Sequence, residues 1–235
     1  MSNEQEKKLA AQASLKFVRD GDVVGLGTGS TAAYFIAALS EQVRKGLRVR
    51  GVPTSNRSAE QAQALGISLA TLEDCPKVDI AVDGADEIDS QLRLIKGGGG
   101  ALLREKIVAS AAKQYVVIAD SSKRVEHLGK FPLPVEVIKC AHALVAGKIE
   151  GLGAKVRLRH GPDGKRFLSD ENNYILDCAF GEIADPERLA RQLADMPGVV
   201  EHGLFIGFAN LVLVGKRDDV LELRPPQKSA RTSSR

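Results

Sequence analysis

The sequence predicts an α/β protein with a Rossmann-like parallel sheet flanked by helices and a smaller α+β lobe inserted into it. Short apolar stretches alternate with helical patterns between residues 22 and 120, which indicates βαβ units and a parallel sheet. After residue 131 this alternation gives way to a proline-broken strand and a pair of strands around a loop. The 235 residues, 43% of them hydrophobic, favour one domain with a smaller lobe over two equal domains.

Apolar spacing, interrupted by glycine and polar residues, predicts the elements of the first part. Helices are expected over residues 4–18, 32–43, 59–65 and 101–113. Strands are expected over residues 22–27, 49–52, 68–71, 78–82 and 115–120.

The second part reads as a small α+β lobe. Strands are expected over residues 131–138, 155–160 and 174–180, with a loop at 161–173, and helices over 143–152 and 185–194. Asp185 followed by Pro186 is a typical helix start. The apolar stretch 203–215 is expected to return to the first sheet. We therefore predict an α/β catalytic domain (1–130 plus 204–224), a small lobe (131–203) and a disordered polar tail (225–235).

Charge and composition exclude several classes of protein. The net charge is +3, and the basic runs at 44–50 and from 224 onward are expected to be solvated surface. With no Trp and few aromatic residues in total, base stacking is not expected, so nucleic acid is not a predicted partner. A membrane is not a predicted partner either. The polar N-terminus lacks a signal-peptide core, and no apolar run is long enough to span a bilayer. Three cysteines without a CxxC pair fit a reducing, cytoplasmic location.

The segment GLGTGST, residues 25–31, joins a strand to a helix. Free amides at a helix N-terminus form an anion site, so a phosphate could bind here. The segment could also be only a helix cap with glycines for the turn. A dinucleotide fingerprint fits poorly, because GxGxxG would need glycine where Ser30 stands and the second strand ends without an acidic residue.

The segment DGADEID, residues 83–89, places four acids directly after an apolar strand. One interpretation is a turn with solvated carboxylates. Oxygen ligands would also suit Mg²⁺ or Ca²⁺, although the spacing does not match an EF-hand loop.

The segment KGGGG, residues 96–100, opens a helix that carries Glu105. Four consecutive glycines are entropically unfavourable unless the backbone must approach a ligand closely. Glu105 shares a helix face with small and apolar residues, and such an environment raises a carboxyl pKa toward the range of a general base. The alternative is an exposed charge within the triplet Arg104-Glu105-Lys106.

Lys123 follows the strand that ends in IADSSK. Taken alone, such a lysine is usually a surface charge. However, ligands in parallel sheets bind beyond the carboxyl ends of the strands, and this lysine shares that edge with residues 27–31 and 83–87. It is therefore a candidate partner for an anion.

These four segments, in this order and together with KFPLPVEV, resemble the A-type ribose-5-phosphate isomerases. The resemblance extends from about residue 21 to residue 215, and KGGGGAL-REK with DGADE is its most specific part. Leu103 departs from the pattern, since many relatives carry threonine there, and the C-terminal tail has no counterpart in it.

The resemblance implies an aldose–ketose isomerase that interconverts D-ribose 5-phosphate and D-ribulose 5-phosphate through an enediolate, with no metal or other cofactor, in the non-oxidative pentose phosphate pathway. It assigns proton shuttling to Glu105, substrate hydroxyls and ring opening to Asp83 and Asp86, and stabilisation of the enediolate to Lys96. It also implies a homodimer or homotetramer. The implied substrate-binding residues are Thr28, Gly29, Ser30, Thr31, Asp83, Gly84, Ala85, Asp86, Lys96, Gly97, Gly98, Gly99 and Lys123.

Two other classes of protein share this predicted sheet. A CoA transferase would use Glu105 as a nucleophile, but nothing else in the sequence suggests a CoA site. A sugar-phosphate sensor would bind without turnover, but no room exists before residue 21 for a helix-turn-helix. Because one fold serves many functions, the residues and not the sheet favour the isomerase.

Overall fold

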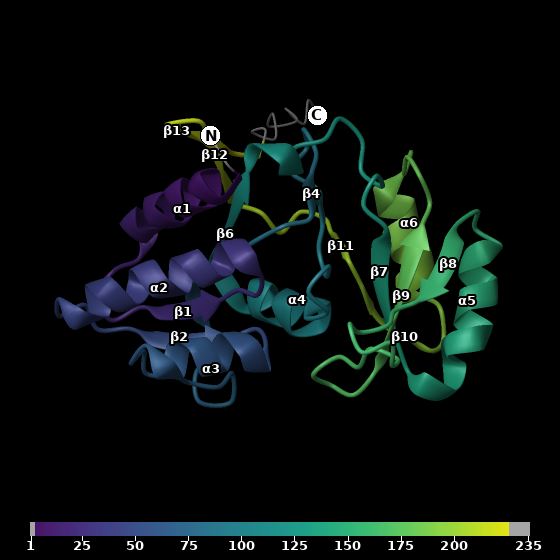
Figure 1. Ribbon diagram of the computed structural model, residues 1–235, viewed down its shortest axis with the longest axis horizontal. Coiled ribbons are helices and arrows are strands. Elements are labelled where there is room, and N and C mark those ends of the chain that lie inside the picture. Colours follow the sequence, from purple (N-terminus) through teal and green to yellow (C-terminus); the bar gives the residue numbers. More distant parts are fainter. Residues whose placement is uncertain (1–2, 226–235) are drawn as a thin grey trace, which may run out of the picture.

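The computed structural model describes residues 3–225 and consists of a large α/β lobe and a smaller lobe beside it (Figure 1). Six strands form the main sheet, in the order β13-β12-β6-β3-β1-β2. All neighbours in it are parallel except β12 and β13. The predicted parallel sheet flanked by helices is therefore confirmed. Its strands are β1 (Val23–Leu26), β2 (Arg50–Pro53), β3 (Val78–Asp83), β6 (Ala112–Asp120), β12 (Leu211–Lys216) and β13 (Asp219–Leu223).

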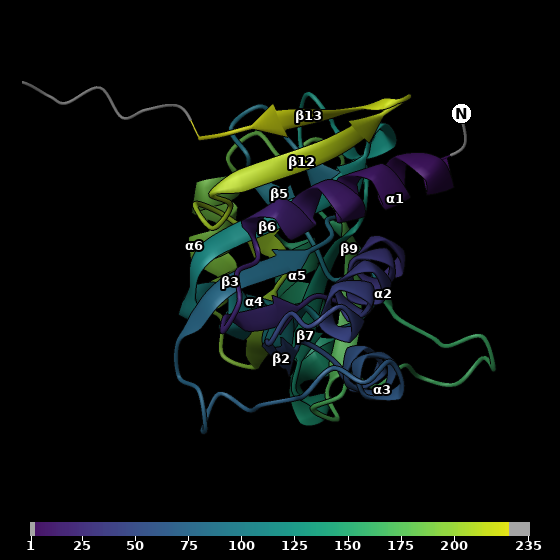
Figure 2. The ribbon, with the colours of Figure 1, turned by 90° about the vertical axis from the view of Figure 1, so that its left-hand side faces the viewer.

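Helices cover both faces of this sheet. On one face lie α1 (Asn3–Ser14), α2 (Ser30–Arg44) and α3 (Asn56–Ala64), visible together in Figure 2. Their core includes Phe35, Ile36 and Leu39, all buried. The other face packs against α4 (Leu102–Ala111) and a three-stranded sheet of β4 (Glu87–Ile88), β5 (Leu94–Ile95) and β11 (Leu204–Phe205).

The small lobe is built on a four-stranded antiparallel sheet in the order β10-β7-β9-β8. Its strands are β7 (Leu133–Val137), β8 (Lys155–Leu158), β9 (Tyr174–Ala179) and β10 (Val199–His202). They pack against α5 (His142–Glu150) and α6 (Pro186–Ala194), and the Asp185 side chain accepts from the N–H of Arg188 as an N-cap. The exact domain boundaries stay a prediction, and residues 226–235 of the predicted tail lie outside the described residues.

Four expected elements differ from the structure. The helix expected over 4–18 ends at Ser14 and is followed by a 3₁₀ turn, Leu15–Phe17. Of the stretch 203–215, β12 joins the main sheet, whereas β11 pairs with β5 in the three-stranded sheet. Residues 68–71 do not form a strand: only Leu69 makes an isolated parallel bridge, to Gly51. Two backbone hydrogen bonds hold this segment to Gly51, and the chain then leaves the sheet edge through a turn. The helix expected over 101–113 ends at Ala111, and β6 begins at the next residue without a connecting loop.

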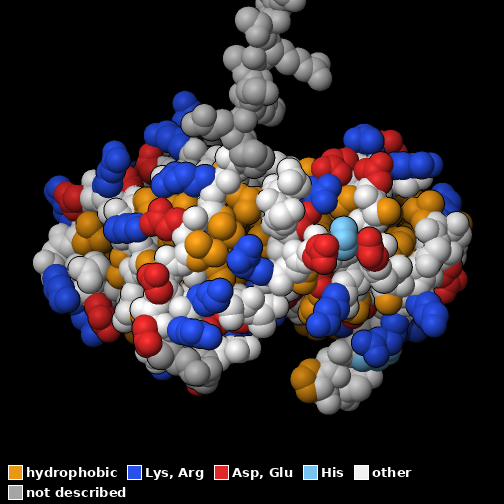
Figure 3. Space-filling view, turned by 90° about the horizontal axis from the view of Figure 1, so that it is seen from above, with side chains coloured by type: hydrophobic (Ala, Val, Ile, Leu, Met, Phe, Trp, Pro, Cys, Tyr) orange, Lys and Arg blue, Asp and Glu red, His pale blue; other side chains and the backbone are white. Residues whose placement is uncertain are grey.

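Charged side chains of both signs are interspersed over the face shown in Figure 3. No stripe of one sign crosses that face, as expected from the mild net charge of the sequence. Within residues 3–225, no helix is long and apolar enough to cross a bilayer.

Candidate active site

The loops that follow β1, β3, β5 and β6 meet around one cavity of about 100 Å³ at the carboxyl edge of the main sheet. This is the edge where parallel sheets bind ligands. Fourteen residues line the cavity, and every predicted site residue except Asp83 is among them. The lining residues are Lys7, Thr28, Gly29, Ser30, Thr31, Gly84, Ala85, Asp86, Lys96, Gly97, Gly98, Gly99, Glu105 and Lys123.

Asp83 is the last residue of β3 and lies buried directly under the cavity. One carboxylate oxygen, Oδ1, accepts from the N–H groups of Thr28 (3.0 Å) and Gly84 (2.7 Å). The other, Oδ2, is 3.0 Å from Lys96 Nζ. Only glycine fits at position 27, because a Cβ there would approach Asp83 Oδ1 to 2.2 Å. Asp83 thus fixes the first loop and the lysine together.

Lys96 follows β5 and is 2% exposed. Its ammonium donates to the carbonyl of Gly84 at 2.6 Å and lies 3.3 Å from Glu105 Oε2. Burial alone would lower the pKa of Lys96, but the charges of Asp83 and Glu105 outweigh it and raise the pKa well above the ordinary value. Lys96 is therefore a fixed positive charge at the floor of the cavity.

Glu105 lies in the first turn of α4 and is 4% exposed. Burial, together with repulsion from Asp83 and Asp86, raises its pKa to about 8, although Lys96 opposes the shift. Burial also raises the pKa of Asp83, but Lys96 and the two amides that Asp83 accepts oppose that shift. The two carboxyls therefore lie in different surroundings, the arrangement that suits carboxyls of different roles.

Asp86 is half-buried and also lines the cavity. Its Oδ2 accepts from the N–H of Gly98 at 2.7 Å. A Cβ on Gly98 would come within 2.6 Å of Asp86 Oδ1. The glycine run thus approaches the acidic loop as closely as a backbone without side chains allows.

The remaining two acids of DGADEID serve the fold. Glu87 accepts from the N–H groups of Gly129 and Phe131, at 2.7 and 2.6 Å. Asp89 accepts from the backbone N–H groups of Gln91 and Arg93 and forms an ion pair with the Arg93 side chain. Within residues 3–225, no three His, Cys, Asp or Glu side chains are grouped as metal ligands, and the absence of a metal requirement stays a prediction.

The other end of the cavity is suited to an anion. The first-turn N–H groups of α2, from Ser30 onward, point out of a helix N-terminus and have no intrahelical partners. Lys123 lies beside them, half-buried in a short 3₁₀ turn. The Thr28 side chain turns away, because its hydroxyl bonds Thr54 and Ser55.

Lys7 is the one lining residue that the sequence did not predict. It comes from α1, which packs on α2, and its Nζ donates to Ser30 Oγ at 3.0 Å. No local signal distinguishes it from its neighbour Lys8, because both stand in one polar helix. Only the packing of α1 brings it to the cavity.

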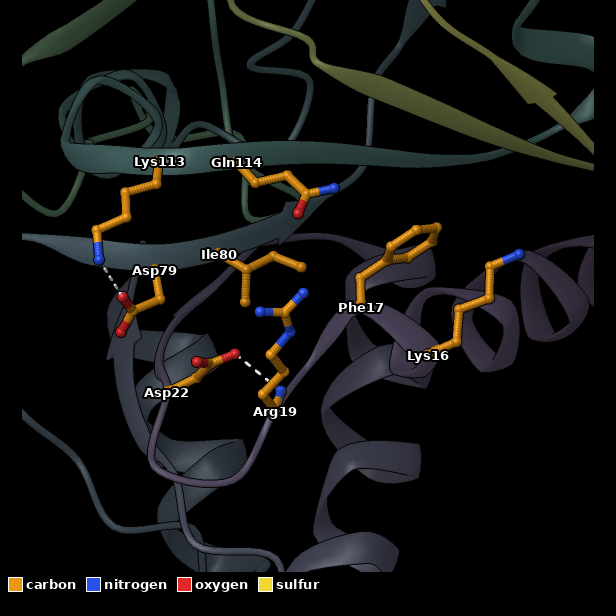
Figure 4. Close-up of a pocket in the computed structure, with 8 residues that line it drawn as sticks. All are labelled: Lys16, Phe17, Arg19, Asp22, Asp79, Ile80, Lys113 and Gln114. Atoms are coloured by element: carbon orange, nitrogen blue, oxygen red, sulfur yellow. Dashed lines mark hydrogen bonds and ion pairs between the residues drawn. The ribbon is translucent and has the colours of Figure 1, made fainter.

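A larger cavity, about 390 Å³, opens at the opposite edge of the sheet (Figure 4). It contains none of the predicted site residues. Its Lys113 forms an ion pair with Asp79 at 2.7 Å, and Asp22 accepts from the backbone N–H of Arg19 at 2.8 Å. The smaller cavity, by contrast, brings together the buried Glu105 and Lys96.

That arrangement can remove a proton beside a carbonyl, because it combines a high-pKa carboxyl with a fixed cation. The family model of ribose 5-phosphate isomerase A (phosphoriboisomerase A) matches residues 50–219. The chain belongs to this family. It is accordingly an isomerase that interconverts D-ribose 5-phosphate and D-ribulose 5-phosphate, a reaction of the pentose phosphate pathway.

Relatives in the family match over nearly their full length. Ribose-5-phosphate isomerase A of Synechococcus sp. is 52% identical over 226 residues, covering 95% of this chain and 98% of the relative. The same enzyme from Parvibaculum lavamentivorans is 52% identical and covers 94% of this chain and 100% of its own.

Solved structures of the family agree with the fold. A D-ribose-5-phosphate isomerase in complex with phospho-erythronic acid superimposes with a TM-score of 0.93 at 41% identity, covering 95% of this chain and 100% of its own. Ribose 5-phosphate isomerase A from Methanocaldococcus jannaschii gives 0.91 at 43% identity, covering 95% and 100%. The resemblance found in the sequence is thereby confirmed, and the CoA transferase and sensor interpretations are set aside.

Proposed function

We propose that the isomerisation proceeds through an enediolate, with Glu105 as the base that moves a proton between C2 and C1. The observation that carries the proposal is the buried Glu105 carboxyl 3.3 Å from Lys96 Nζ. The carboxylate takes the C2 proton of the open-chain aldose, and the C–H electron pair forms the C1–C2 double bond while O1 becomes negative. Glu105 then delivers a proton to C1, the O2 proton passes to O1, and C2 becomes the carbonyl carbon of the ketose.

Lys96 would stabilise the negative oxygen of that intermediate. Its charge is held in place by Asp83 Oδ2 and by the Gly84 carbonyl. A preorganised charge at a developing oxyanion supplies about two to three orders of magnitude in rate. In this proposal a divalent metal is not required.

Asp86 would handle the substrate hydroxyls. It lines the same cavity as Glu105, and the proton on O2 must reach O1 when the ketose forms. Asp83 is 1% exposed and engaged by two amides and Lys96, so in our proposal it acts mainly by holding Lys96.

The phosphate would bind at the other end of the cavity. The N-terminus of α2, Lys7 and Lys123 supply amides and two positive charges there. The related enzyme of the solved complex binds phospho-erythronic acid, which combines a phosphate with a sugar acid. A ligand of that chemistry fits this cavity, because one end can bind the phosphate and the other presents the Lys96 ammonium to the sugar acid.

We also propose that the chain forms a homodimer or homotetramer and works in the cytoplasm. Four of the exposed large apolar side chains belong to the small lobe: Ile138, Leu144, Leu152 and Leu168, with Leu144 60% exposed. The three cysteines are all free, which fits a reducing compartment.

The proposed mechanism is tested by following ketose formation from ribose 5-phosphate in deuterated water after exhaustive chelation. We expect full turnover, with deuterium entering at the exchanged carbon to an extent set by how well the cavity excludes water. Loss of activity that only an added divalent ion restores would contradict the metal-free mechanism. Turnover with no exchange in either substrate or product, at any conversion, would argue against a proton shuttle open to solvent.

A further inference from the structure

Arg159 links the small lobe to the glycine run. It follows β8, and its backbone is fixed on both sides by hydrogen bonds to Ile175 and Phe167. Its guanidinium Nη1 donates to the carbonyl oxygens of Gly97, at 2.9 Å, and Gly98, at 3.2 Å. The side chain is only 13% exposed, so these bonds are largely shielded from water.

The rest of the guanidinium is held from behind. Asp177 of β9 accepts from Nε at 3.1 Å and forms an ion pair with Nη2. The ring of Phe167 lies 5.7 Å from the guanidinium carbon and also touches the run, because a Cβ on Gly100 would meet it at 2.4 Å. Arg159 is thus a rigid, oriented donor and not a loose surface charge.

The carbonyl of Gly97 and the N–H of Gly98 belong to one peptide group. That N–H is the donor that holds Asp86 Oδ2 at 2.7 Å. Because a trans peptide is planar, fixing the direction of its oxygen fixes the opposite direction of its N–H. One planar unit therefore connects Arg159 on one side with Asp86 on the other.

The local chain holds this peptide by one contact, a hydrogen bond from the N–H of Gly100 to the Gly97 carbonyl at 2.9 Å. Glycine stands on both sides, and Gly97 already has a φ of +99°, so no Cβ opposes rotation of the unit. A flip would turn the N–H away from Asp86. Two donors to the carbonyl oppose the flip: the Gly100 N–H within the run, and Arg159, whose charged donor comes from the other lobe.

We propose that Arg159 is a positioning residue for the isomerisation: it fixes the Gly97–Gly98 peptide, which in turn holds Asp86 toward the substrate. This rests on the role proposed above for Asp86. It gives the small lobe a part in the reaction, although Arg159 itself touches no reacting atom.

The first test compares Arg159→Met with Arg166→Met. Arg166 lies on the same connection but is exposed and stacks on Tyr174, away from the glycine run. We expect Arg159→Met to lower kcat by about tenfold or more, because small displacements of a reacting group are costly in rate, while KM changes by less than about threefold. Arg166→Met should match the wild type. A raised KM with an unchanged kcat would overturn the proposal.

A second variant guards against misfolding. Removing Arg159 alone leaves Asp177 without its partner, which is destabilising. The double variant Arg159→Met/Asp177→Asn carries no unpaired charge, so it is expected to keep a near-normal melting temperature with the same low kcat. A stable double variant with wild-type kcat would overturn the proposal.

The decisive test is a double-mutant cycle with Asp86→Ala. If Arg159 acts through Asp86, Arg159→Met should slow the Asp86→Ala enzyme by no more than about twofold. If the two losses multiply, Arg159 does not act through Asp86 and the proposal is wrong. If Asp86→Ala alone keeps the wild-type kcat, the role proposed for Asp86 fails, and this inference fails with it. If Asp86→Ala lowers kcat but Arg159→Met does not, the role of Asp86 stands and only the positioning role of Arg159 is refuted.

Discussion

Glu105 shows how burial decides the role of a single residue. Its neighbours in the charged triplet turn away from the site: Arg104 pairs with Glu171, and Lys106 pairs with Glu201 at 2.7 Å. Only Glu105 is directed into the cavity floor, where it has lost its water. On an exposed helix Glu105 would be an ordinary surface carboxylate, so its desolvation is what makes this carboxyl different.

Replacing Glu105 by Gln should abolish proton transfer without changing the shape of the site. We expect kcat to fall by about two to four orders of magnitude, the usual contribution of a general base, while the mutant still binds sugar phosphate. Steady-state assays and solvent-exchange measurements on protein checked by circular dichroism test this. Arg104→Ala, one position earlier, should be far milder. A folded Glu105→Gln enzyme with near-normal kcat would move the base to another carboxyl.

The pKa of Glu105 also predicts a pH dependence. The value is about 8, against 4.5 for the ordinary side chain, so kcat/KM should rise with pH and level off above about 8. A raised carboxyl pKa means that the folded state loses stability as pH rises from 4.5 to about 8. Glu105→Gln removes this penalty. The free energy of unfolding is measured in urea for the variant and the wild type at both pH values. The stability advantage of the variant over the wild type should be larger at pH 8.5 than at pH 4.5, by at least about 1 kcal/mol. An equal difference at both pH values would contradict the shift.

Lys7 is predicted to contribute to binding more than to chemistry. It lies at the anion-binding end of the cavity, where it is hydrogen-bonded to Ser30, and it has no part in the proposed proton transfer. Lys7→Ala should raise KM for ribose 5-phosphate by about tenfold with a smaller effect on kcat, and Lys123→Ala should behave alike. Lys8→Ala is the matched control, because Lys8 lies over the Tyr34 ring instead. A collapse of kcat at constant KM would show that these lysines act in the chemical step.

The elements show where local patterns succeed. Hydrophobic periodicity predicted most helices and strands correctly. Each helix buries one face against the sheet, and the central strands bury both faces, so the apolar residues follow the period of the element. Periodicity failed at residues 68–71, where the apolar alternation is real but the segment makes a single bridge at the sheet edge. Whether a segment at a sheet edge forms a paired strand depends on the residues that lie beside it in the fold. The sequence pattern of that one segment does not contain this information.

The glycine run is the element on which the site depends most closely. Gly98→Ala would push a Cβ to within 2.6 Å of Asp86 Oδ1, and the carboxylate, at the end of a side chain, can move aside. We therefore expect a folded protein whose kcat falls by about tenfold to a hundredfold, because Asp86 is displaced. Gly147→Ala, in α5, has open space at its Cβ and should leave kcat unchanged. Wild-type kcat in Gly98→Ala, by steady-state assay, would show that Asp86 need not stay where it is.

At the scale of the whole molecule, the two lobes meet through the connection between β8 and β9. Asp170 on that connection accepts from the backbone N–H of Asn56 at 2.8 Å and lies 3.8 Å from Arg104, while Arg159 reaches the glycine run. This connection thus contacts three segments of the large lobe: the start of α3, helix α4 and the glycine run. The small lobe is therefore packed against segments that carry or adjoin the cavity residues.

The assembly state is the prediction that belongs to this scale. We expect a mass of two or four chains by light scattering at micromolar concentration, since apolar side chains such as Leu144 and Ile138 remain exposed on the small lobe. Leu144→Glu should weaken the assembly if this lobe forms the interface. A monomer mass for the wild type would refute it.

The sequence by itself determined the alternating fold, the four loops at one sheet edge and Glu105 on a small-residue helix face. It could do so because each follows from local spacing, or from glycines that only a close approach justifies. The tertiary structure alone separated the acids of DGADEID: Asp86 lines the cavity, Asp83 is buried against Lys96, and Glu87 and Asp89 hold the backbone. It alone brought Lys7 and Arg159 to the site, because contacts between residues far apart in the chain, and the loss of water that sets a pKa, exist only once the elements have packed.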